Sequence, residues 1–193
     1  MFDYTEAPQQ RDIELIPAGT VATLQLAIHP GGAGEEGLLK RSKDGSCEML
    51  ECEFVVVDGQ FARRKFWQHL LLRGTTDAQT QMAETNRGKL RAILESARDI
   101  KPDDFSPQTR TARNAKLVAF DGIRFIGKIG IEKGGGKSDG NGNYPDRNVL
   151  QFVITPDRKG WHAVEQTPPQ SSDASSGGAA PAPAAISKPK WAS

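Results

Sequence analysis

The chain has 193 residues, of which 25 are lysine or arginine and 24 are aspartate or glutamate, and its formal net charge is +1. Whole-molecule electrostatics therefore do not indicate a polyanionic partner, and a nucleic-acid site would need local segregation of charge. Two cysteines are too few for a secreted disulfide scaffold, and with three scattered histidines they do not suggest a zinc site, so we expect no metal and no other cofactor. The N-terminus lacks a signal-peptide pattern, and no apolar stretch approaches a membrane span, which predicts a cytoplasmic protein without membrane contact.

Alternation of apolar and polar residues predicts the first three strands. VATLQLAI, after a Pro-Ala-Gly turn, predicts a strand at residues 21–28, and the glycine-rich, charged segment behind it is expected to be a long loop. A second strand is predicted at residues 49–57 and a third at residues 64–72. The second strand places four apolar residues on one face, namely Leu50, Cys52, Phe54 and Val56.

The period then changes to that of a helix. Thr76 or Asp77 can cap a helix that runs to about residue 97, and Ser106-Pro107 is typical of the start of a second, short helix that runs to about residue 115. The apolar stripe of the first helix is predicted to contain Met82, Leu90, Ile93, Leu94 and Ala97. Strands four and five are predicted at residues 123–133 and 148–155, joined by the hairpin tip GGGKSDGNGNYPDR.

This order of elements predicts a mainly β fold of the α+β class. Three strands, a helix and two further strands is the order of an OB-fold, a five-stranded barrel with the helix between strands three and four. A plain β-sandwich with an inserted helical segment is the alternative. The domain is predicted at residues 13–164, between an N-terminal arm at residues 1–12 and a Pro/Ala/Ser/Gly-rich tail at residues 165–193, for which the lack of apolar side chains predicts disorder.

The stretch EFVVVDGQFARRKFWQHLLL decides which side chains share a face of the sheet. A two-residue turn at Asp58-Gly59 would mix the apolar row of one strand with the basic row of the next. One more loop residue, or one bulge, removes this conflict by placing Cys52 opposite Phe66 and Glu53 opposite Lys65. We therefore predict a longer loop, which puts Phe66, Leu70 and Leu72 in the core and a basic and aromatic row on the outer face, formed by Arg63, Lys65, Trp67 and His69.

A second basic and aromatic set lies on strand four and in the loop behind it. The predicted topology would bring both sets to one groove, where cations bind phosphates while Trp67 and Tyr144 stack bases. The candidate nucleic-acid-binding residues are Arg63, Lys65, Trp67, His69, Arg124, Lys128, Lys133, Lys137, Tyr144 and Arg147. Such a site predicts single-strand binding without sequence preference and with marked salt dependence. Glu51 and Glu53 weaken the positive field, and the ordinary alternative is a sheet face with cross-strand ion pairs.

Catalysis has no positive support in the sequence. GGGKS is not a phosphate loop because Ile131 stands where that motif needs its first glycine, and no nucleophile-plus-base pair stands out, so we expect no enzymatic activity. Two alternatives stay open. One is a protein-interaction module of the same fold, such as a phage assembly subunit or an accessory factor, that uses the outer apolar positions Val55, Val57 and Leu71. The other is a small metal-dependent nuclease.

Several segments carry a resemblance to known proteins. IPAGTVATLQLAIHPGG, LECEFVVVDGQFARRKFW, GKLRAILESARDIKPDDFSP, FDGIRFIGKIGIEKG and YPDRNVLQFVITPD resemble a family of bacterial prophage and mobile-element proteins of unknown function. The chain is more distantly similar to phage proteins with an EFEVLDG-type strand, a GRK-aromatic strand, a helix and a late Tyr-x-x-x-Asn strand. The resemblance covers about residues 13–157 and implies an OB-type single-strand-binding role in replication or recombination, with pattern positions at Arg63, Arg64, Lys65, Trp67, Tyr144 and Asn148.

The expected partner is thus single-stranded DNA, or RNA, which the sequence does not distinguish, inside a bacterial cell or a phage-infected host. Bacterial single-strand-binding proteins usually end in an acidic tip that recruits other proteins. This tail instead ends Lys-Pro-Lys-Trp-Ala-Ser, so replication or recombination proteins would bind it by different chemistry. The sequence leaves the oligomeric state open.

Overall fold

The computed structural model describes residues 14–135 and 145–166. The predictions for the N-terminal arm, for Lys137 and Tyr144 and for nearly all of the C-terminal tail lie outside these residues.

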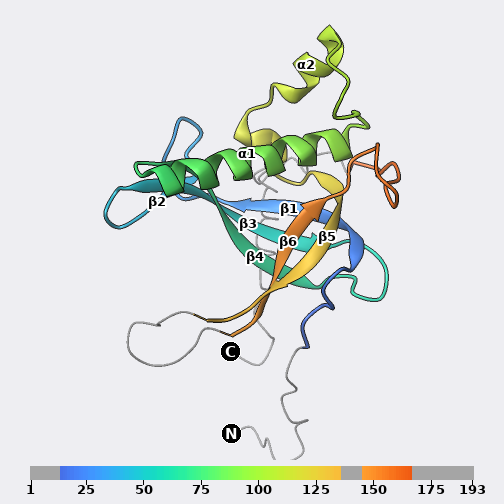
Figure 1. The fold of residues 1–193 in the computed structure, drawn as a ribbon, viewed down its shortest axis with the longest axis horizontal. Coiled ribbons are helices and arrows are strands. Elements are labelled where there is room, and N and C mark those ends of the chain that lie inside the picture. Colours follow the sequence, from blue (N-terminus) through green and yellow to red (C-terminus); the bar gives the residue numbers. More distant parts are fainter. Residues whose placement is uncertain (1–13, 136–144, 167–193) are drawn as a thin grey trace, which may run out of the picture.

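Six antiparallel strands form one curled sheet (Figure 1). The strands are β1 (Val21–His29), β2 (Leu39–Arg41), β3 (Cys47–Val56), β4 (Lys65–Gly74), β5 (Arg124–Glu132) and β6 (Arg147–Val153). β3 pairs with β4 on one side and with β1 and the short β2 on the other, and β1 continues through β5 to β6. Five of these strands lie where the periodicity predicts them.

The prediction of an unbroken loop before β3 is wrong, because β2 forms inside that segment. Leu39 is the bridge partner of Ala33 as well as of Leu50 on β3. The chain folds back so closely that a Cβ atom on Gly31 would lie 2.5 Å from the Cα atom of Lys40. A three-residue strand is too short to show alternation, and only this tertiary contact defines it.

Both predicted helices form, each with the predicted cap. Thr76 caps α1 (Asp77–Ala97) in a reciprocal capping box with Gln79, and Ser106 caps α2 (Pro107–Arg113), which has Pro107 in its first turn. A 3-10 turn, η1 (Leu117–Phe120), leads into β5. The prediction that Met82 belongs to the apolar stripe of α1 is wrong, since its side chain is 55% exposed. Ala83 and Asn86 are buried instead, because they align with Leu90 and Ile93 at helical spacing.

The core lies between the inner face of the sheet and α1. The predicted inner row of β3 is buried, as are Phe66, Leu70 and Leu72 on β4. The rings of Phe54 and Phe66 stack with their centroids 5.2 Å apart, and Phe125 meets Phe54 edge-on at 6.2 Å.

The sheet stays open between β4 and β6, where the predicted barrel would close. No backbone ladder joins these strands within the described residues, and α1 lies across the sheet instead (Figure 1). Side chains bind the free backbone groups of the two edges. Gln68 Oε1 accepts from the Leu150 N–H at 3.0 Å, and Lys89 Nζ donates to the Leu150 carbonyl at 3.4 Å. On β4, Asn86 donates to the Leu71 carbonyl at 3.1 Å.

Replacing Asn86 with alanine tests the role of α1 at this opening. The substitution leaves the Leu71 carbonyl without its donor, and we expect a loss of about 1–3 kcal/mol in the free energy of unfolding. Urea unfolding followed by circular dichroism measures this loss. Met82→Ala on the same helix is the control and should change stability by less than about 0.5 kcal/mol. Equal losses in the two variants would contradict this role.

Candidate nucleic-acid interface

The β3–β4 hairpin has a longer loop than a two-residue turn, as predicted, but its pairing differs from the predicted one by two residues. Phe66 lies opposite Phe54, not Cys52, and Trp67 lies opposite Glu53. The added length comes from a bulge in which Arg63 and Arg64 both oppose Val56: the Arg63 N–H donates to the Val56 carbonyl at 2.8 Å, and the Val56 N–H donates to the Arg64 carbonyl at 2.9 Å. Because the shift is two residues, the predicted separation into inner and outer rows still holds.

Arg63 occupies an uncommon backbone conformation in this bulge. Its φ of 67° lies in the left-handed region, where an L residue other than glycine costs about 1–2 kcal/mol. Residues held in such conformations are found more often at functional sites than elsewhere, so the bulge is a reason to examine what surrounds it.

Glu53 organises the outer face of the hairpin. Its carboxylate binds Lys65 Nζ at 2.7 Å and accepts from Trp67 Nε1 at 3.1 Å, while His29 Nε2 from β1 lies 3.4 Å away. The hydrogen bond from Lys65 is the main reason that the pKa of Glu53 lies below its ordinary value of 4.5. The Trp67 indole is thereby held at its N–H edge while its side chain stays 53% exposed.

Glu51 repeats this arrangement two residues along β3. Lys40 of β2 binds its carboxylate at 2.8 Å, and His69 Nε2 lies 3.7 Å away. The hydrogen bond from Lys40 is the largest cause of the lowered pKa of Glu51. Two lysines thus face two carboxylates, and the middle of the outer face carries no net charge from these four groups.

A pocket of about 570 Å³ lies where β4 and β6 begin, at one end of the opening in the sheet. It brings Arg63, Lys65 and Trp67 of the hairpin together with Arg147, which is far away in the sequence. The remaining lining residues are Leu15, Arg64, Phe66, Asp146 and Asn148. Among the described residues, four cations and one carboxylate therefore line this pocket, which we call the hairpin pocket.

The cations of the hairpin pocket differ in how firmly they are held. Arg147 binds Glu132 at 2.7 Å in an ion pair whose side chains are both more than half exposed, and Arg64 donates to the Glu14 carbonyl. Exposed pairs contribute only about 0–1 kcal/mol, so a phosphate can replace Glu132 at little cost. Arg63 has neither an ion-pair nor a hydrogen-bond partner for its side chain among residues 14–135 and 145–166.

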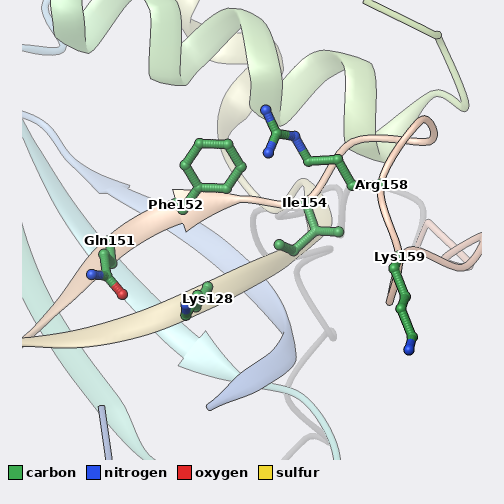
Figure 2. A pocket seen from close by; sticks show the side chains of 6 residues that line it. All are labelled: Lys128, Gln151, Phe152, Ile154, Arg158 and Lys159. Carbon is green, nitrogen blue, oxygen red and sulfur yellow. The ribbon is translucent and has the colours of Figure 1, made fainter. Parts of the chain in front are cut away.

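The other candidate residues are dispersed. Lys133 binds Asp146 at 2.7 Å, and Arg124 donates to Gln25 at 3.3 Å near the opposite end of β5. His69 lies on the outer face of β4 beyond Trp67, next to Glu51. Lys128 lines a second pocket of about 520 Å³ on β5 and β6, which Figure 2 shows together with Phe152 and Arg158. The structure thus groups Arg63, Lys65, Trp67 and Arg147 in the hairpin pocket. Lys133 is connected to this pocket only through its ion pair with the lining residue Asp146, and the other described candidates lie apart.

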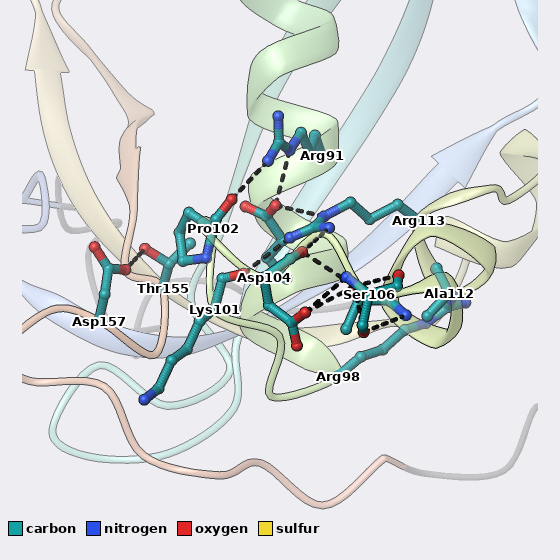
Figure 3. A network of polar contacts seen from close by, with 12 residues as sticks. Arg91, Arg98, Lys101, Pro102, Asp104, Ser106, Ala112, Arg113, Thr155 and Asp157 are labelled. Carbon is teal, nitrogen blue, oxygen red and sulfur yellow. Dashed lines mark hydrogen bonds and ion pairs between the residues drawn. The ribbon is translucent and has the colours of Figure 1, made fainter.

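An arginine cluster beside α1 holds the chain in place (Figure 3). Arg91 and Arg113 both bind the buried carboxylate of Glu95, at 2.8 and 2.7 Å. Arg113 also donates to the carbonyls of Asp104 and Lys101, which fixes α2 and the loop before it against the C-terminal end of α1. Because these donors are occupied, the cluster is structural.

Two residues of the second pocket were not predicted from the sequence, and one position of the resemblance pattern has a structural role. Phe152 was not singled out because an irregularity in the pairing of β5 with β6 turns its side chain outward, and a bulge leaves no local signal. Arg158 lies in a bend after β6, where no alternation marks it. Asn148, a pattern position of the resemblance, is buried and exchanges hydrogen bonds with the backbone of Ile16 at 2.9 and 2.8 Å. The three apolar positions of the alternative interface, Val55, Val57 and Leu71, are half-buried.

No protein-family model matches the sequence, and a search of curated proteins finds no significant relative. Among the described residues, no group of three or more histidine, cysteine, aspartate or glutamate side chains is arranged to hold a metal ion. Within the same residues, no helix combines the length and the apolar character needed to cross a membrane.

The lowered pKa values of Glu51 and Glu53 predict how stability depends on pH. A carboxylate whose folded-state pKa is depressed stabilises the fold above its unfolded pKa of about 4.5, and this contribution is lost as the pH falls through the folded-state value. We expect the free energy of unfolding to fall as the pH is lowered from about 5 through the depressed folded-state pKa values, and to fall less steeply in Glu53→Gln. Urea unfolding across this range measures the slope. Glu84→Gln on the exposed side of α1 is the control, and a slope in Glu53→Gln equal to that of the control would contradict the prediction.

Substitution of Glu95 tests the structural role of the arginine cluster. Glu95→Ala leaves the largely buried Arg113 without its carboxylate, and we expect a loss of about 3–5 kcal/mol in unfolding free energy. Arg91 is 47% exposed, so Arg91→Ala should cost clearly less. Thermal and urea unfolding provide the comparison, and a neutral effect of Glu95→Ala would show that the cluster does not hold α2.

Proposed function

We propose that the protein binds single-stranded DNA without sequence preference and without catalysis, in the replication or recombination of a phage or mobile element. The observation that carries this proposal is the hairpin pocket, in which an oriented, exposed Trp67 lies beside Arg63 and Arg147. An aromatic platform next to cations is the combination that single-strand-binding surfaces use, since every base has a π-face and every nucleotide has a phosphate.

Trp67 is suited to stacking because its orientation is already determined. The hydrogen bond from its indole N–H to Glu53 fixes one edge of the ring, so that little side-chain entropy remains to be lost when a base binds. Stacking of this kind contributes about 1–3 kcal/mol per base.

Arg63 and Arg147 are the phosphate ligands of this proposal. Arg63 has no competing partner among the described residues, and Arg147 has only an exposed ion pair to exchange. Lys65 contributes less, because Glu53, which is largely buried, already holds it at 2.7 Å. Because Glu51 and Glu53 neutralise the lysines in the middle of the outer face, a DNA strand would bind at the cationic hairpin end of this face.

The fold is consistent with this role. Leaving the short β2, α2 and η1 aside, the order is three strands, a helix and two strands. OB-folds share this order and are partly open barrels that bind oligonucleotides over strands two and three. Those strands correspond to β3 and β4, which carry Trp67 and Arg63 at their hairpin end. The biological setting of the proposal rests on the resemblance to prophage and phage proteins.

Fluorescence anisotropy with a labelled oligothymidine, at low and at moderate salt, tests the proposal. We expect Trp67→Ala to weaken binding by about five-fold or more, and Arg63→Gly to lower the salt dependence by roughly 0.7 in log–log slope. Glycine adopts the left-handed φ of Arg63 without steric cost, so this variant should be at least as stable as the wild type. A loss of binding in Arg63→Gly would therefore not be due to unfolding.

Lys43→Ala, an exposed lysine of the β2–β3 loop outside the hairpin pocket, is the matched charge control. Absence of binding by the wild-type protein at micromolar concentration and low salt would overturn the proposed function. Binding that survives Trp67→Ala and Arg63→Gly undiminished would place the site elsewhere on the molecule.

A further inference from the structure

We infer that the pocket around Lys128, Phe152 and Arg158 is a second nucleotide subsite. A single strand of DNA bound in the hairpin pocket would continue along β6 to reach it. The inference rests on the proposed function. It extends that function by assigning a path on the protein surface, and a minimum length, to the bound DNA strand. We call this pocket the β6 pocket; its lining residues are Lys128, Gln151, Phe152, Ile154, Arg158 and Lys159 (Figure 2).

The β6 pocket combines three cations with one aromatic ring. Its volume is about 520 Å³, and none of the described residues that line it is a carboxylate. None of Lys128, Arg158 and Lys159 forms an ion pair within residues 14–135 and 145–166, whereas Lys40, Lys65 and Arg147 all do. The carboxylate nearest in sequence, Asp157, accepts a hydrogen bond from the Thr155 hydroxyl at 2.5 Å. The positive charge of this pocket is therefore available to an anion.

Phe152 supplies a surface for a base. Its side chain is 40% exposed, and the guanidinium carbon of Arg158 lies 4.3 Å from the ring centroid. This cation–π contact orients both groups, with the guanidinium lying over the ring. A base that stacks on the exposed part of the ring would have its phosphate near the guanidinium N–H groups.

The outer surface of β6 connects the two pockets. Arg147 lines the hairpin pocket and Phe152 the β6 pocket, five residues further along the same strand. Arg147 and Gln151 are exposed, Val149 between them is half-buried, and the alternating Asn148 and Leu150 are buried, so the outer positions of β6 lead from one pocket to the other. Five residues of extended chain span about 16 Å, a distance that a strand of a few nucleotides covers, and OB-type sites hold about 4–16 nucleotides.

A length series of oligonucleotides tests whether one strand occupies both pockets. Labelled oligothymidines of about 4 and about 12 nucleotides are titrated by anisotropy into the full-length protein. The wild type should bind the longer strand at least about ten-fold more tightly, because a strand held in one pocket presents its continuation to the other at high effective concentration. Phe152→Ala and Lys159→Ala should each remove much of this gain, whereas Met82→Ala and Lys43→Ala, exposed and outside both pockets, should keep it.

The outcomes separate this inference from the proposed function. If the oligonucleotides bind with dependence on Trp67 but both β6-pocket variants retain the full gain with length, the second subsite is overturned and the proposed function stands. If Phe152→Ala weakens the short and the long strand equally, the pocket acts alone and the continuous path is overturned. If the wild type binds neither strand, the proposed function fails and the inference fails with it. Circular dichroism before titration confirms that each variant is folded.

Discussion

The opening between β4 and β6 is the constraint on which the rest of the structure depends. Backbone N–H and C=O groups left without partners cost about 1–3 kcal/mol each when buried, so two sheet edges facing each other need donors and acceptors from elsewhere. Gln68 on β4 and Asn86 and Lys89 on α1 supply them. Burial against β6 lowers the pKa of Lys89, which shows how closely the helix covers this side of the sheet. The position of α1 is therefore set by polar contacts at the opening as much as by its apolar stripe.

The same opening shapes the proposed interface. The hairpin pocket lies at one end of it, where the bulge at Arg63 and Arg64 and the start of β6 come together. In the middle of the outer face, Glu51 and Glu53 hold Lys40 and Lys65, which leaves the surface neutral there. At its margins lie cations such as Arg63 and Lys128, which have no carboxylate partner within the described part of the chain. A chain with a net charge of only +1 can in this way present local positive pockets while other basic residues, such as Lys40, Lys65 and Arg113, are engaged in ion pairs.

Much of the fold could be predicted from local patterns, and the errors share one cause. The cap at Thr76, the proline start at Ser106-Pro107 and the buried row from Leu50 to Val56 were predicted correctly, because each depends on neighbours within a turn or on a period of two. Met82 was assigned to the core because helical spacing places it only about 20° from Ile93, at the edge of the buried stripe. Whether a residue at the edge of a stripe is covered depends on what packs against it, which the sequence does not show. The hairpin pairing was wrong by two residues, because a bulge with arginine in the position usual for glycine has no sequence signature.

The sequence by itself determined the separation of inner and outer rows, the helix boundaries and the order of the elements, since propensity, capping and alternation act over a few residues. Only the tertiary structure decided that β2 forms, that the sheet stays open, and that Arg63, Lys65 and Trp67 meet Arg147 while Lys133 and Arg124 bind other partners. These outcomes depend on contacts between segments distant in the chain, and they are selected by which backbone groups and charges find partners when the sheet curls. The side chains on the outer row of β4 could be recognised from the sequence, but which of them remain available to a ligand could not.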